Sequence, residues 1–90
     1  MSVAINLPPI FRQLSGAAPG EGVSGDTVGE CLDELVERFP ELREKLFTGE
    51  GNIQNGISVF INGENAYPGE LDKPVQSGDT LHIAQVVLGG

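Results

Sequence analysis

The sequence predicts an α+β fold in which a mixed sheet of four to five strands carries one main helix across it and a second short helix beside it. Two kinds of apolar pattern support this. Apolar residues alternate with polar ones at both ends of the chain and around residue 59, which is typical of half-buried strands. Between these stretches, apolar residues recur at helical spacing. A helix laid across one face of a sheet is the simplest way to bury both patterns.

The first strand is expected in residues 1–7, and Pro8-Pro9 should end its hydrogen bonding. Three apolar residues after it are expected to pack back on the core from an irregular connection: Ile10, Phe11 and Leu14. Residues 15–25 are rich in Gly, Ala, Pro and Ser, which indicates a turn, with a short strand near Val23.

The main helix has a clear start and end. Thr27 and Glu30 have the Thr-x-x-Glu form of a capping box. The apolar stripe that follows has spacings of four, three and four residues, at Val28, Leu32, Leu35 and Phe39. Pro40 should end this helix and open a short second helix over residues 41–47.

The second half of the chain predicts three strands. Residues 57–61 alternate, and Asn62-Gly63 after them is a strong signal for a two-residue hairpin turn. A short return strand is expected around residues 64–67. The last strand is expected from Thr80 to about Val86.

Length and charge restrict the function. Ninety residues predict a single domain, 1–90, with a flexible tail at 86–90. The net charge is −8 with only five basic residues, so nucleic-acid binding is not expected, and an anionic membrane would repel the chain. No apolar run approaches the roughly 20 residues that span a bilayer. No secretory signal is expected, and the single cysteine fits a reducing cytoplasm.

Few side chains suit catalysis. Cys31 lies on the apolar stripe and is expected to be a core residue rather than a reactive thiol. His82, the only histidine, should lie on the outer sheet face as a surface residue or a partner contact, and no metal site is expected. Five acidic residues cluster on helical polar faces, either as a solvated surface or as a docking face for a basic partner: Asp33, Glu34, Glu37, Glu41 and Glu44.

The chain ends in Gly89-Gly90 directly after a predicted strand. Two glycines make a slim tip that can enter a narrow channel in another protein, and the last group is a carboxylate. A partner could activate that carboxylate with ATP and exchange one oxygen for sulfur. A frayed end without a role is the alternative.

Several segments carry a resemblance to a known family. They are INLPPIFRQLSG at 5–16, GDTV at 25–28, FPELREKL at 39–46, ISVFING at 57–63, SGDTL at 77–81 and the terminal diglycine. In order and spacing they resemble the MoaD/ThiS family of ubiquitin-like sulfur carriers, and the start looks most like the CysO type. A proline that the family often carries shortly before the glycines is absent here, where residues 84–88 read AQVVL.

The resemblance implies a β-grasp fold, in which the first and last strands pair in parallel. It implies adenylation of Gly90 by a ubiquitin-activating-type ATPase, which uses the ATP, so the carrier itself binds no cofactor. It further implies conversion to a thiocarboxylate and sulfur delivery to a biosynthetic enzyme. The acceptor would be cysteine-synthase-like, with molybdopterin-synthase-like and thiamine pathways as alternatives.

The alternation of the strands also predicts a docking patch. If Val59 and Ile61 point inward, the outer face carries Phe60, His82, Ala84 and Val86, and Val87 and Leu88 extend this patch along the tail. Ordinary surface is the alternative reading. Three other functions stay open: a ubiquitin-like modifier joined through Gly90 to lysines, a binding subunit in which the glycines are incidental, and an enzyme acting alone.

Overall fold

The fold was taken from a computed structural model, which describes residues 2–85. Its centre is a five-stranded sheet in the order β2-β1-β5-β3-β4. The strands are β1 (Val3–Asn6), β2 (Glu21–Val23), β3 (Ile57–Ile61), β4 (Glu64–Asn65) and β5 (Thr80–Gln85). The central pair β1–β5 is parallel and the other pairs are antiparallel, so the mixed sheet and the parallel pairing of the first and last strands are confirmed.

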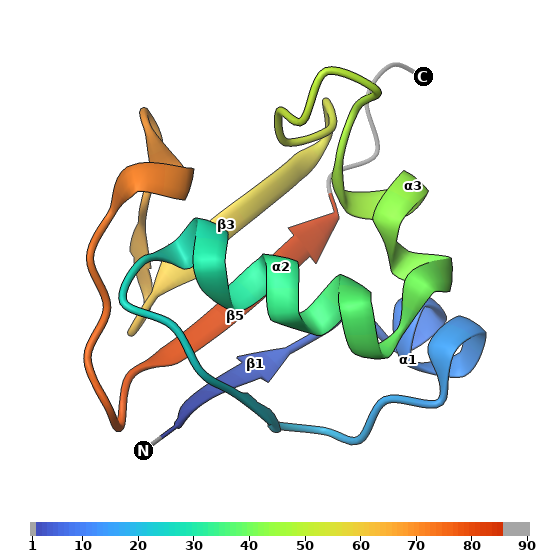
Figure 1. Cartoon of the computed structure of the whole chain (residues 1–90), viewed down its shortest axis with the longest axis horizontal. Coiled ribbons are helices and arrows are strands. Elements are labelled where there is room, and N and C mark those ends of the chain that lie inside the picture. The colour runs from blue at the N-terminus through green and yellow to red at the C-terminus, as the bar shows by residue number, and fades with distance from the viewer. Residues whose placement is uncertain (1, 86–90) are drawn as a thin grey trace.

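The main helix, α2 (Val28–Arg38), runs across one face of this sheet (Figure 1). Its first turn is capped as the sequence predicts. The Thr27 hydroxyl accepts a hydrogen bond from the backbone N–H of Glu30 at 3.2 Å. The Glu30 carboxylate reaches one residue further back than a standard capping box and accepts from the N–H of Asp26 at 2.8 Å. The helix ends before Pro40, as predicted.

The core lies between α2 and the inner face of the sheet. Its largest fully buried side chains come from β1, α2, β5 and the segment after Pro40, and they are Ile5, Leu32, Leu35, Leu42, Leu46 and Leu81. Burial of each such side chain contributes about 1.5–3 kcal/mol, so this contact dominates the stability of the fold.

The segment after Pro40 differs from the expected helix over residues 41–47. It forms a 3₁₀ turn, η1 (Pro40–Leu42), and then a single helical turn, α3 (Arg43–Leu46). Phe47 already has an extended backbone and pairs with Ile53 across the following loop, because it packs against the core from that position. Tertiary packing therefore shortens this helix.

The connection after Pro8 was predicted wrongly. It is a helix, α1 (Pro9–Ser15), that begins at a proline and ends at Gly16, whose φ of 82° is the left-handed conformation of a glycine cap. Only Phe11 of its apolar residues is buried. Ile10 and Leu14, expected to pack on the core, are instead 59% and 46% exposed, and Phe11 alone supplies the buried contact of this helix.

The β3–β4 hairpin is confirmed in type and is tied to β5. Asn62 and Gly63 have φ values of 52° and 88°, as a type I′ turn requires. The Asn62 side chain accepts from the N–H of Thr80 at 2.9 Å and donates to Asp79 at 3.0 Å. The Asn62 bond and a second one from the N–H of Gln76 lower the pKa of Asp79. The strand β4 is shorter than expected, ending at Asn65.

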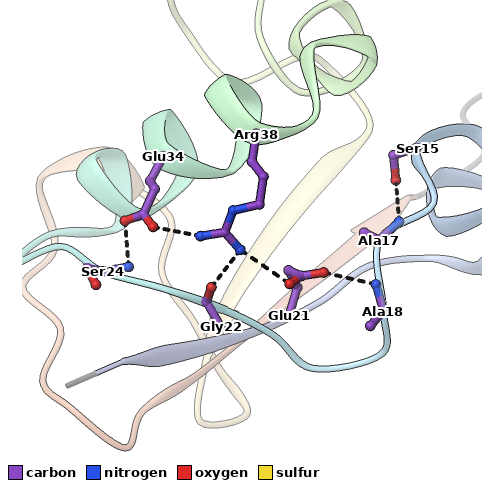
Figure 2. Close-up of polar contacts among 8 residues, drawn as sticks. All are labelled: Ser15, Ala17, Ala18, Glu21, Gly22, Ser24, Glu34 and Arg38. Carbon is purple, nitrogen blue, oxygen red and sulfur yellow. Dashed lines mark hydrogen bonds and ion pairs between the residues drawn. The ribbon is translucent and has the colours of Figure 1, made fainter.

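A polar network fastens the edge strand β2 to α2 (Figure 2). The Arg38 guanidinium donates to Glu21 at 3.2 Å, to the carbonyl of Gly22 at 2.9 Å and to Glu34 at 2.8 Å. The second oxygen of Glu34 accepts from the N–H of Ser24 at 2.7 Å. Arg38 thus joins the end of the helix to the first two residues of a three-residue strand, and Glu34 binds the residue that follows the strand.

Replacing Arg38 should loosen β2. We expect Arg38→Gln to lower the free energy of unfolding by about 1 kcal/mol, because these bonds are partly solvated, and to speed amide exchange in β2 selectively. Urea unfolding and hydrogen exchange measure the two effects. Arg43→Gln is the matched control, since within residues 2–85 both ion pairs belong to Arg38. Equal effects of the two substitutions would contradict this role for the network.

Candidate functional site at the end of the central strand

The C-terminal strand β5 lies in the middle of the sheet, between β1 and β3 (Figure 1). Its last residue, Gln85, is paired with Ile57 at the start of β3. The described part of the chain therefore ends on the central strand of the sheet. The predicted reactive residues Gly89 and Gly90, and the predicted contacts Val86, Val87 and Leu88, lie outside the described residues.

The outer face of the sheet brings the other predicted contacts together. The strand register aligns Phe60 with His82, and Ala84 is the next outward residue along β5. His82 is exposed, as predicted. Phe60 and Ala84 are half-buried, so the aromatic ring is less exposed than the alternation suggests. Their role in binding stays a prediction.

The thiol of Cys31 is unsuited to chemistry. It is fully buried on α2, and this burial, with smaller effects from Glu34, Glu30 and Asp26, raises its pKa from 9.0 to about 11. A thiol with such a pKa is almost entirely protonated at neutral pH and is a poor nucleophile. It also lies across the sheet from His82, so the two do not form a catalytic pair. The prediction of a core cysteine is confirmed.

The acidic helical faces are mostly open to solvent, with the exception of Glu34, which binds Arg38. Within residues 2–85, no three side chains of the metal-binding types come together. None of the helices in this part of the chain is long and apolar enough to cross a bilayer.

Sequence reasoning missed an apolar surface beside the end of β5. Ile10 and Leu14 of α1 share a groove with Gln85. The missed signal was the proline pair before residue 10 together with Gly16, which mark the start and end of a helix. With a helix in place, the four-residue spacing of Ile10 and Leu14 puts both on one face.

Comparison with known proteins settles the family. The sequence profile of the ThiS family matches residues 11–90, nearly the whole chain. The chain belongs to the ThiS family. This ThiS-family protein is 27% identical over 93 residues to the sulfur carrier protein CysO of Mycobacterium tuberculosis, and the match covers both chains completely. It is 41% identical over 69 residues to small archaeal modifier protein 1 of Haloferax volcanii, covering 76% of each chain.

Solved structures confirm the ubiquitin-like β-grasp fold of the ThiS-family protein. A structure of the BexX/CysO complex of Amycolatopsis orientalis matches with a TM-score of 0.85 and 31% identity, over 98% of this chain and 99% of that one. The crystal structure of the Haloferax volcanii modifier matches with a TM-score of 0.84 and 31% identity over the whole of both chains. These relatives are thus named as sulfur carrier or modifier proteins.

The buried thiol predicts a specific pH dependence. The unfolded chain ionises Cys31 near pH 9.0, whereas the folded chain holds the proton until about pH 11. Rising pH therefore favours unfolding across this window, so stability present below pH 9.0 is lost on approaching pH 11. Urea unfolding from pH 8 to 11 should show a steeper alkaline loss in the wild type than in Cys31→Ala. Equal slopes, or rapid reaction of the native thiol with a disulfide reagent at pH 8, would contradict the burial.

Proposed function

We propose that this ThiS-family protein carries sulfur as a thiocarboxylate on Gly90. The observation that carries the proposal is the family match, which extends through Gly90 in a chain whose full length matches a sulfur carrier. The arrangement of the described residues supports it. The only thiol is buried, the only histidine lies on the opposite side of the sheet, and the central strand ends at Gln85, five residues before Gly90 in the sequence.

The reaction needs two steps on a partner enzyme. A carboxylate oxygen of Gly90 attacks the α-phosphorus of ATP, which forms an acyl adenylate and releases pyrophosphate. A hydrosulfide equivalent then attacks the acyl carbon, AMP leaves with the bridging oxygen, and one proton is released. The product is a thiocarboxylate. The partner, a ubiquitin-activating-type adenylating enzyme, supplies positioning and charge stabilisation, so the carrier needs no cofactor of its own.

Cysteine synthesis is the pathway that we favour for the delivered sulfur. The support is the complete coverage of the CysO match, and the acceptor would then be cysteine-synthase-like. Molybdopterin and thiamine synthesis are the next candidates, the former with a molybdopterin-synthase-like acceptor. We place the carrier in the cytoplasm, where ATP is available and a single cysteine stays reduced.

A second function has its own support. The 41% identity to small archaeal modifier protein 1 favours a protein modifier joined through Gly90 to lysines. Both functions begin with the same activated carboxylate and differ in the nucleophile that attacks it. Isopeptide-linked adducts in cells would identify the modifier, and their absence alongside a thiocarboxylate would leave the carrier.

Intact mass measurement tests the carrier directly. After incubation with ATP, sulfide and an extract of the source cells, replacement of one terminal oxygen by sulfur should add about 16 Da, a difference set by atomic masses. The gain should require ATP. A chain lacking Gly89 and Gly90 is the matched control and should gain nothing. An unchanged wild-type mass, or biological activity that survives removal of both glycines, would contradict the proposal.

The outer sheet face is the docking surface that we propose for the adenylating enzyme, through Phe60, His82, Ala84 and the apolar residues Val86, Val87 and Leu88. Cross-strand pairing holds Phe60 of β3 beside His82 of β5. Since β5 is the strand that precedes Gly90 in the sequence, a partner that receives Gly90 can cover both side chains. Aromatic side chains are frequent binding anchors.

Phe60→Ala should weaken binding of the adenylating enzyme about tenfold, equivalent to roughly 1.4 kcal/mol. Titration calorimetry measures the affinity, and urea unfolding checks that the half-buried site tolerates the change. Tyr67→Ala is the control, because Tyr67 is 72% exposed and lies beyond β4, at a distance along the sheet from β5. Unchanged affinity in Phe60→Ala would remove this face from the binding surface.

A further inference from the structure

The groove beside the end of β5 has the features of a second binding surface. It measures about 460 Å³ and opens between α1 and α3, which lie at the same end of the molecule (Figure 1). Its lining residues are Ile10, Phe11, Gln13, Leu14, Lys45 and Gln85. Apart from Gln13, Lys45 and Gln85, these side chains are apolar, and the groove is open to solvent.

The apolar lining is not required by the core. Phe11 supplies the buried contact of α1, whereas Ile10 and Leu14 point outward one helical turn apart. Within residues 2–85, they and Tyr67 are the exposed large apolar side chains. Two of three such residues therefore lie in one groove, and paired exposed apolar residues of this kind are typical of helix faces that bind a partner.

The position of Gln85 connects this groove to the reactive end. Gln85 lines the groove, and Gly90 is five residues further along the sequence. Five extended residues reach at most about 17–18 Å. A protein that encloses the Gly90 carboxylate must therefore lie within that distance of Gln85, which is close enough for it to contact the adjoining helix α1 as well.

Charge indicates what the partner presents. The chain has a net charge of −8, yet the rim of the groove carries the ammonium of Lys45. In the described part of the chain, ion pairs are made by Arg38 and none by Lys45. Its charge is therefore available to a carboxylate on another protein, and at the edge of an apolar contact such a pair adds orientation and specificity.

We propose that the enzyme that adenylates Gly90 docks on this groove with an apolar side chain between Ile10 and Leu14 and a carboxylate at Lys45. This inference rests on the proposed sulfur-carrier function. The groove would be a second contact with the enzyme, on the helical side of the molecule, in addition to the contact proposed on the outer sheet face. The enzyme would then hold the carrier on both sides of the strand that presents the tail.

Steady-state kinetics of adenylation test the groove. The probe is the adenylating enzyme purified from the source cells by its carrier-dependent ATP–pyrophosphate exchange. The double variant Ile10→Gln/Leu14→Gln should raise the KM for the carrier at least tenfold and leave kcat within twofold. Both side chains are already exposed, so the unfolding midpoint should not change.

The charge is tested separately with a matched pair of variants. Lys45→Glu should raise KM about fivefold, and the increase should shrink at high salt. Lys73→Glu makes the same charge change at an exposed lysine far from the groove lining and should leave KM unchanged. If KM is unaltered in both the double variant and Lys45→Glu while the wild type supports normal exchange, the docking groove is overturned and the proposed function is not. Absence of wild-type exchange overturns the proposed function and this inference with it.

Two other occupants give distinct results. If residues 86–90 fill the groove in the free protein, the methyl resonances of Leu14 will shift when the chain is shortened to end at Gln85. If a second copy fills it, sedimentation will show a dimer that the double variant abolishes. Either result overturns the proposal, and a monomer with unshifted Leu14 resonances supports it.

Discussion

The parallel pairing of β1 with β5 is the constraint on which the rest of the structure depends. Ala4 is aligned with Thr80 and Ile5 with Leu81, so the first and last strands of the chain share the centre of the sheet. Parallel strands need a long connection, and here almost every other element forms part of it. As a result, the last described residue, Gln85, ends a strand that has a neighbour on each side.

In this fold, the residues that stabilise the domain are distinct from the group that we propose to react. The interior is closed and apolar, and its one thiol is held protonated by burial. The central strand instead presents two different surfaces near its end: the outer sheet face with Phe60 and His82, and the groove beside α1. These features are consistent with the function that we propose, in which a partner binds the domain and performs the reaction at the carboxylate of Gly90.

Charge is used in two ways. The acidic excess covers the exposed helical faces and would favour partners with basic surfaces at long range. Of the few cations, Arg38 is used internally, where it joins the edge strand β2 to the helix α2. Lys45 makes no ion pair within residues 2–85, and we propose that it binds a partner's carboxylate at the groove. The acidic residues would thus attract a partner at long range, whereas we propose that Lys45 orients it on contact.

Local patterns of the sequence were sufficient for the larger elements. Alternation located the strands β1, β3 and β5, and the capping residues Thr27 and Glu30 located the start of α2. The turn at Asn62-Gly63 follows from backbone angles that few residues adopt. The short elements were less predictable. The helical turn of α3 ends early because Phe47 packs against the core, and a seven-residue helix such as α1 shows too little periodicity to stand out.

By itself, the sequence determined the α+β class, the buried place of Cys31 and the diglycine end, because periodicity, capping and chain-end chemistry are local properties. The β-grasp pairing of the first and last strands was expected only from the family resemblance. Only the tertiary structure decided that Phe60 stands opposite His82, that Ile10 and Leu14 remain exposed, and that they share a groove with Gln85 and Lys45. These residues are far apart along the chain. Their meeting depends on strand register and helix docking, which local pattern does not specify.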